Sequence, residues 1–165
     1  MQFTSSYVPE NRSDDTDPDV HQAHQDGTSL HYERIERELR EAGMSWFGLW
    51  LTESQYLSRL IHENESIKGV TYGWQSGGIV MLIATDQRII FLDKNTFFHR
   101  DDEVNYGDVR GIRYYPAGLA STIVLHTQAR DFIVRTYNKA SLKKFIDYID
   151  LHGIVYMDEE DVRDD

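Results

Sequence analysis

The sequence predicts a mainly β fold with α-helices: a seven-stranded β-sandwich or barrel, a C-terminal helix that caps it, and a helical extension ahead of it. Two apolar runs, at 79–84 and 89–92, flank the polar junction Thr85-Asp86-Gln87-Arg88, as in a pair of buried strands. Short segments rich in β-formers, separated by turn residues, make up the rest of the region from 67 to 137. One amphipathic helical segment follows, and such a helix has to cover an open end or face of the strands.

Composition and charge limit the function classes. The 165 residues are enough for one domain with extensions. The chain has no cysteine, which excludes disulfides and cysteine nucleophiles and fits a reducing compartment, so we expect a cytoplasmic protein. The net charge of −11 divides into −7 for residues 1–63, +1 for 64–152 and −5 for 153–165. Acidic ends oppose long-range attraction to nucleic acid and anionic lipid, and we expect no nucleic-acid partner.

The first 27 residues carry two prolines, five aspartates and almost no aliphatic side chains. Such a segment buries too little surface to offset the entropy of ordering, so we expect a disordered acidic tail at 1–27. His21 and His24 have the spacing of two metal ligands on one helical turn, but no third ligand is near them in the sequence. We therefore expect no metal site and no cofactor.

Residues 28–51 form a helical and apolar extension. We expect a helix from Thr28 or Ser29 to Gly43. Its apolar residues recur at helical spacing and form one stripe: Tyr32, Ile35, Leu39 and Ala42. This stripe either packs on its own domain or a neighbouring subunit, or it serves as a dedicated partner-binding helix.

Trp46, Phe47 and Trp50 concentrate aromatic surface in a short stretch, which is unlike a segment left in water. Burial against the core or across a dimer interface is the favoured interpretation, because Trp and Phe dominate both settings. Insertion at a membrane interface is the alternative. The flanking residues are mainly acidic, whereas interfacial helices usually carry Lys or Arg on the polar face.

The domain itself is expected at 52–157 and begins with a helix after the capping box Thr52-Glu53-Ser54-Gln55. Seven strands are predicted near 67–74, 78–85, 87–93, 103–106, 109–115, 121–128 and 131–137. Asn138 is the expected N-cap of the last helix, in which Leu142, Phe145, Ile146 and Ile149 share a face, and Gly153 ends it. Residues 158–165 are expected to be a solvated acidic tail.

The junction with Thr85, Arg88 and Phe91 follows the pattern Thr-[Asn/Asp]-x-Arg-[Ile/Leu]-x-[Phe/Leu]. It resembles the hairpin core of bacterial pleckstrin-homology-like (PH-like) domains, particularly the YokE-like group. The resemblance covers about 52–152 and includes an acidic residue after the first helix, here Glu63 or Glu65, and the step from Val104 to Val109. It implies a PH-like fold in which these positions set strand pairing and core packing and none of them is catalytic.

Eukaryotic relatives of this fold bind phosphoinositides through a basic loop between the first two strands. The corresponding segment here, 73–78, has no basic residue, so inositide binding is not expected. Arg110, Arg113 and Arg135 are weak candidates for an anion patch, since cations beside Tyr114 and Tyr115 are typical of phosphate or single-stranded nucleic-acid sites. The same residues are also ordinary on the wet face of a strand.

Neither a nucleophile motif nor a phosphate loop nor a complete set of spaced metal ligands is found, so no enzymatic activity is expected. The sequence favours a non-enzymatic PH-like binding module or scaffold that acts through protein–protein contacts, including self-association. The interaction candidates are Tyr32, Ile35, Leu39, Trp46, Phe47 and Trp50. The alternative is a peripheral lipid-binding module that uses the aromatic residues at 46–50, and membrane contact is not favoured. A hydrolase would need a histidine and a carboxylate brought to a hydroxyl by the fold.

Overall fold

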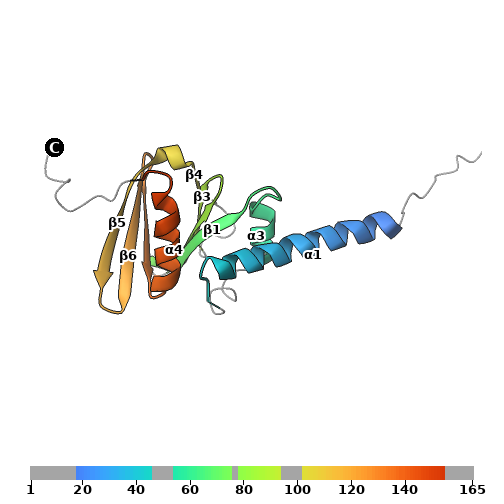
Figure 1. The fold of residues 1–165 in the computed structure, drawn as a ribbon, viewed down its shortest axis with the longest axis horizontal. Helices are drawn as coiled ribbons and strands as arrows, with labels where there is room; N and C mark the ends of the chain where they lie inside the picture. Colours follow the sequence, from blue (N-terminus) through green and yellow to red (C-terminus); the bar gives the residue numbers. More distant parts are fainter. Residues whose placement is uncertain (1–17, 46–53, 76–77, 94–101, 155–165) are drawn as a thin grey trace, which may run out of the picture.

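The computed structural model describes residues 18–45, 54–75, 78–93 and 102–154, and it confirms the predicted fold class (Figure 1). Seven antiparallel strands lie between N-terminal helices and one C-terminal helix. In chain order the elements are α1 (Pro18–Glu41), α3 (Ser54–Leu60), β1 (Ile67–Gln75), β2 (Gly78–Thr85), β3 (Ile89–Asp93), β4 (Asp102–Val104), the short 3-10 helix η2 (Tyr106–Asp108), β5 (Val109–Ala117), β6 (Ala120–Thr127), β7 (Asp131–Thr136) and α4 (Lys139–Asp150).

The strands form one sheet in the order β4-β3-β2-β1-β7-β6-β5. Strands β1–β4 make up its first half and β5–β7 its second half, and β1 joins the two by pairing with β7. Hydrogen-bonded partners place Trp74 near the end of β1 directly opposite Arg135 of β7. The backbones come unusually close there, because a Cβ added to Gly73 would lie 2.0 Å from the Arg135 carbonyl oxygen. Only glycine fits this crossing without a shift of the backbone.

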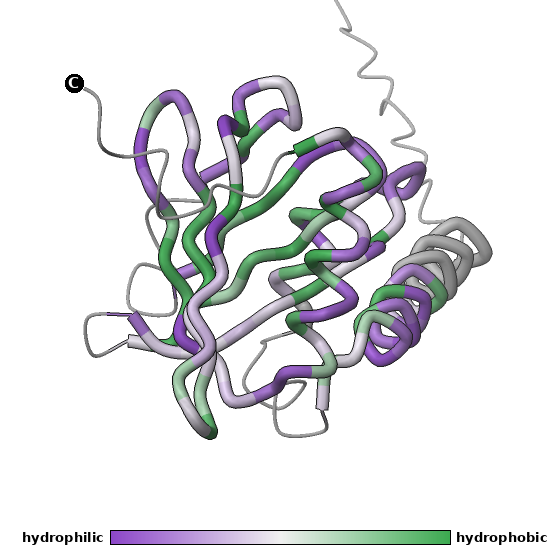
Figure 2. Tube along the Cα trace, turned by 60° about the vertical axis from the view of Figure 1, so that its left-hand side comes forward, coloured by the Kyte–Doolittle hydropathy of each residue, from purple (hydrophilic) through white to green (hydrophobic). Residues whose placement is uncertain are grey.

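Two hydrophobic cores lie on opposite sides of the first half of the sheet. One joins the inner faces of both halves to α4, and its fully buried members include Leu82, Ile123 and Phe145. The other joins the outer face of β1–β3 to α1 and α3. Strands β2 and β3 are therefore buried on both faces, which explains their continuous apolar runs. Figure 2 shows hydrophobic stretches along several strands of the sheet. Strand β7 instead alternates buried and exposed residues.

Helix α1 docks on its own domain. Ile35 and Leu39 are fully buried in the outer core, and the His31 Nε2 atom lies 3.0 Å from the Ile61 carbonyl oxygen. The Ile67 backbone N–H donates to the Glu38 carboxylate at 2.8 Å, which ties the helix to the start of β1. Of the two interpretations of the apolar stripe, packing within the domain accounts for Ile35 and Leu39.

The start of α1 differs from the prediction. The helix begins at Pro18, so residues 18–27, expected to be disordered, are helical, while 1–17 lie outside the described residues. Proline is tolerated in a first turn, where its missing N–H has no intrahelical partner in any case, and each added residue extends a helix that docking has already nucleated. The end agrees, since Gly43 has a φ of 95° just beyond Glu41.

Truncation of Leu39 tests how firmly α1 is docked. The variant Leu39→Ala is expected to lower the free energy of unfolding by about 2–3 kcal/mol, because it removes buried methyl groups and leaves a cavity between helix and sheet. Leu30→Ala is the matched control on the same helix, and it should change stability by less than about 0.5 kcal/mol because Leu30 is exposed. Urea unfolding of both variants is the measurement. Equal effects would show that α1 does not depend on this contact.

Helix α4 follows its prediction closely. The Asn138 side chain accepts a hydrogen bond from the Ser141 backbone N–H at 3.1 Å, as an N-cap does. Its apolar face packs against β1, where Gly69 allows Phe145 to approach the strand. Lys143 pairs with Asp147 on the exposed side.

Candidate functional site

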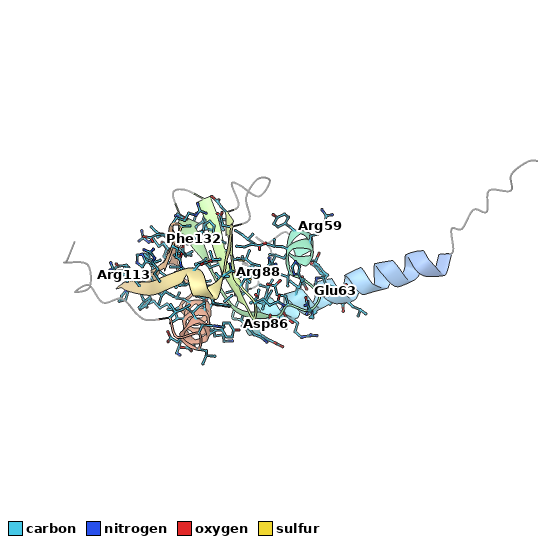
Figure 3. All side chains as sticks on the ribbon, turned by 90° about the horizontal axis from the view of Figure 1, so that it is seen from above. Arg59, Glu63, Asp86, Arg88, Arg113 and Phe132 are labelled. Carbon is cyan, nitrogen blue, oxygen red and sulfur yellow. The ribbon has the colours of Figure 1, made fainter. Side chains whose placement is uncertain are left out.

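The Thr85–Arg88 junction is held by one buried carboxylate. Glu65 has no exposed surface and accepts hydrogen bonds from the Thr85 hydroxyl at 2.7 Å and from the Arg88 guanidinium at 2.9 and 3.0 Å. Arg88 also donates to the Leu60 carbonyl oxygen at the end of α3 and pairs with Glu103. The cluster thus connects α3, the β2–β3 turn and β4, and Figure 3 shows Arg88 between the strands and α3.

The charges in this cluster match its hydrogen bonds. Burial acts to raise the pKa of the Glu65 carboxyl, but the hydrogen bonds from Arg88, Thr85 and the His62 backbone outweigh it and hold the pKa below its ordinary value of 4.5. The hydrogen bond with Glu65 raises the pKa of Arg88. Both groups are therefore charged and paired near neutral pH, which is a structural arrangement and leaves no reactive group.

Tyr106, Tyr148 and His152 form an aromatic cluster beside the same junction. The Tyr106 and His152 rings stack with centroids 3.7 Å apart, and the Tyr106 hydroxyl donates to the Thr85 carbonyl oxygen. Burial raises the pKa of both Tyr106 and Tyr148, so these hydroxyls stay protonated at neutral pH. This cluster anchors the end of α4 to η2 and is unsuited to proton transfer.

The outer face of the second half of the sheet is the first candidate surface. Register places Tyr115, Thr122, Arg135 and Trp74 in one row across β5, β6, β7 and β1. Arg113, Val124 and Ile133 form the next row. We call Trp74, Arg113, Tyr115, Val124, Ile133 and Arg135 the outer face. None of the described helices packs on its β5–β7 part, and Trp74 is 50% exposed.

Two arginines on this face have no acidic partner in the part of the chain that the structure describes. Among the described residues, neither Arg113 nor Arg135 forms an ion pair, and the Arg113 Nε atom is buried without a hydrogen-bond partner. They lie two strands apart and two residues out of step, or about 12 Å between backbones. Arg110 lies before a bulge at the start of β5 and is not in either row. Figure 3 shows Arg113 far from α1.

A hollow of about 470 Å³ opens beside Trp74, at the point where the cover provided by α1 ends. We call it the Trp74 pocket. Its lining is mainly apolar and aromatic, and Tyr137 on its rim is 63% exposed. The side chains around it are Ser45, Tyr72, Trp74, Ile79, Tyr137 and Asn138.

The polar atoms of the Trp74 pocket are already engaged with one another. The Asn138 amide nitrogen donates to the Gly43 carbonyl oxygen at 3.0 Å and to the Tyr72 hydroxyl at 3.2 Å. The Tyr72 hydroxyl is also 2.6 Å from the Ser45 hydroxyl. The polar groups of Asn138, Tyr72 and Ser45 are therefore engaged, while Trp74, Ile79 and Tyr137 add apolar and aromatic surface, which suits an apolar occupant.

A second hollow of about 530 Å³ lies between β4 and the β6–β7 turn. Its cation, Arg130, pairs with Asp102 and lies over the Phe132 ring at 4.6 Å from the centroid. Because that charge is already paired, this hollow is a poorer candidate for binding an anion than the outer face.

Some of the predicted site residues are buried, some lie on the outer face, and others fall outside the described residues. Ile35 and Leu39 are buried within the domain, and the Tyr32 hydroxyl donates to Glu36 on the same helix. Trp46, Phe47 and Trp50 lie outside the described residues. Of the anion candidates, Arg113 and Arg135 share the outer face. Trp74 and Tyr137 were not predicted as site residues, although alternation along 131–137 puts Ile133, Arg135 and Tyr137 on one side of the strand.

Within the described ranges, no group of three His, Asp or Glu side chains gathers at metal-binding distance. His21 and His24 fall in the first turns of α1, where side chains are outside the description. No described helix is both long and apolar enough to cross a bilayer.

Comparisons with known proteins place this geometry in context. The family model described as "Bacterial PH domain" matches residues 61–150. A DUF1696 family protein with a pleckstrin-homology domain from Shewanella loihica PV-4 is 15% identical, with 61% of this chain and 93% of that chain covered and a TM-score of 0.40. The hSac2 domain of the human phosphoinositide phosphatase Sac2 is 12% identical, with 67% and 85% covered and a TM-score of 0.40. None of the curated proteins matches.

Proposed function

Because the chain belongs to the bacterial PH domain family, we propose that it is a non-catalytic binding module that docks a protein partner on the outer face. One observation carries this proposal. Over β1–β3 the outer side of the sheet is covered by α1 and α3, whereas over β5–β7 none of the described elements covers it. The uncovered part keeps exposed Tyr115 and Ile133 beside the exposed Trp74.

The composition of the outer face favours a protein partner. Trp, Tyr and Arg are the residues most enriched at energetic hot spots of protein interfaces, and this face presents all three types in adjacent positions. Arg113 and Arg135 are free of acidic partners within the described ranges, so a partner's carboxylates can pair with them. The α1 stripe, by contrast, is occupied by the domain itself.

A membrane surface fits less well. Each Lys or Arg near an anionic membrane contributes about 1 kcal/mol, so the two arginines supply about 2 kcal/mol, whereas stable anchoring uses clusters of several basic residues. The net charge of −11 opposes approach to an anionic surface. Lipid binding through Trp46, Phe47 and Trp50 is the alternative that the experiments must distinguish from protein docking.

A photo-crosslinking amino acid at position 133 tests the proposal. In the native cell extract, the full chain with the crosslinker at Ile133 is expected to give discrete crosslinked protein bands, identified by mass spectrometry. The same crosslinker at Lys143, on the exposed side of α4, is the control for random collisions and should give none of these bands. Arg135→Glu in the Ile133 crosslinking chain should abolish them.

Vesicles provide the opposing outcome. The purified chain is mixed with vesicles of equal parts phosphatidylcholine and phosphatidylserine and sedimented. Protein docking predicts that the chain stays in the supernatant. Sedimentation that depends on Trp46 and Trp50, together with the same bands from positions 133 and 143, would contradict the proposal and favour the lipid alternative.

A further inference from the structure

We propose that the Trp74 pocket receives residues 155–161 of a second copy of this chain, which makes the module self-associate head to tail. The inference rests on the proposed function, because it names the partner of the outer face and of the pocket that opens beside it. It is carried by the chemistry of the pocket, the sequence of the segment and the length of α4.

The pocket and its surroundings specify an apolar segment next to an acidic one. The lining offers Trp74 and Tyr137, while the Asn138 amide and the Tyr72 hydroxyl are already hydrogen-bonded within the domain. Arg135 lies directly opposite Trp74 across the strands, with their Cβ atoms about 5 Å apart, and it has no acidic partner among the described residues. An occupant with an apolar side chain for the pocket and a carboxylate for Arg135 is therefore the best match.

One segment of this chain has that pattern. Residues 155–157 are Val-Tyr-Met, and residues 158–161 are Asp-Glu-Glu-Asp. Tyr156 or Met157 supplies the apolar side chain, and the four carboxylates follow at once. Half of the other acidic residues belong to the first 63 residues, where Ile35 and Leu39 of the α1 stripe are already buried.

The segment cannot reach the pocket of its own domain. Asn138, the N-cap of α4, lines the pocket, and the 12 residues of α4 lead about 18 Å away from it. At the far end His152 is stacked on Tyr106 and Ile154 is buried in the inner core. Three residues beyond Ile154 span at most about 11 Å, so Met157 falls short of the pocket that Asn138 lines. The apolar residues can enter the pocket of another copy only.

The resulting contact is heterologous, since the pocket of one copy meets the segment of the next. Such a contact does not close in a dimer, because every dimer keeps one free pocket and one free segment that can bind further copies. The mass of the purified chain should therefore rise with concentration beyond the dimer, without a plateau there.

Light scattering on the full chain is the first measurement. The expected mass exceeds 19.3 kDa and increases with concentration, and a synthetic peptide of residues 154–161 should lower it by competing for the pocket. Arg135→Glu, and separately Tyr156→Asp with Met157→Asp, should each return the mass to that of the monomer. Arg110→Glu changes the same charge away from the pocket and should leave self-association unchanged.

Mixing the two defective chains tests the geometry. The Arg135→Glu chain keeps an intact segment and the Tyr156→Asp/Met157→Asp chain keeps an intact pocket, so their mixture should form a heterodimer of about twice 19.3 kDa and stop there. A twofold-symmetric interface, in which the two copies exchange segments, would instead stop at the dimer in the unmutated chain as well. In anisotropy titrations of the labelled 154–161 peptide, Arg135→Glu should raise the Kd by about tenfold or more.

A chain that stays monomeric and does not bind the peptide would overturn this inference, and so would self-association that survives both sets of substitutions. Crosslinks from position 133 to other proteins would in that case leave the proposed function standing with a different partner. Absence of crosslinks together with pocket-dependent self-association in the purified chain would support the inference and restrict the proposed function to self-recognition.

Discussion

Replacing Glu65 by glutamine is expected to lower the free energy of unfolding by about 3 kcal/mol or more. The carboxylate is fully buried and pairs with Arg88, and its removal leaves this largely buried guanidinium with only the half-exposed Glu103 as a counter-charge. The neutral amide cannot accept from Thr85 and both Arg88 nitrogens as the carboxylate does. Urea unfolding at neutral pH, followed by far-UV circular dichroism, measures the loss.

Glu103→Gln is the matched control for this prediction. Glu103 pairs with the same arginine, but its side chain is 51% exposed, so the expected loss is below about 1 kcal/mol. Similar losses for the two variants would contradict the assignment of Glu65 as the residue that holds the junction together.

The same carboxylate predicts an acid dependence. Because the folded-state pKa of Glu65 is depressed, the unfolded chain binds the proton more readily, and the stabilisation is complete above the ordinary pKa of 4.5. It is lost as pH falls through the lower, folded-state value. The stability of the Glu65→Gln variant should lack this part of the acid dependence. The free energies of unfolding of the variant and of the wild type should therefore converge as pH falls below about 4.

Gly73→Ala is expected to lower the free energy of unfolding by more than about 3 kcal/mol, the upper end of the range for overpacked sites. The added Cβ would lie 2.0 Å from the Arg135 carbonyl oxygen and 2.6 Å from its carbon, and both are backbone atoms that cannot rotate away. Relief requires β1 and β7 to separate at the position that joins the two halves of the sheet. The loss should appear in urea unfolding.

Gly107→Ala is the control for Gly73→Ala, because nothing lies within 4 Å of the Cβ it would add. Its expected effect is within about 0.5 kcal/mol of wild type. If Gly73→Ala behaves like this control, β1 and β7 do not cross as closely as the structure shows.

Much of the fold could be predicted because local patterns and tertiary packing agree. Helix α4 has its cap, apolar face and terminal glycine in the expected places, and β2 was predicted at 78–85 with both ends correct. The family pattern predicts an acidic residue at Glu63 or Glu65, and Glu65 is the one whose side chain is fully buried. Such signals lie within a few residues of one another, where the sequence can show them.

The candidate site could not be predicted in the same way. The outer face depends on which residues of four strands share a row, and that depends on the register of β1 against β7 and on a bulge between Val109 and Gly111. The predicted strand at 67–74 does not show that Trp74 is exposed, because its exposure depends on where the cover by α1 stops. The start of α1 was missed since composition alone does not show that a docked helix continues outward.

Helix α1 also sets the distance between its N-terminal turn and the domain. His31 is the first residue of α1 with a described side chain that hydrogen-bonds the rest of the domain. The 13 residues from Pro18 to Leu30 place the start of the helix about 20 Å from it, and Figure 1 shows the helix extending away from the sheet. Each residue inserted in this stretch would move the first turn by about 1.5 Å and rotate it by about 100° around the helix axis. An insertion of about seven residues, close to two full turns, would lengthen the arm by about 10 Å and nearly restore its original direction.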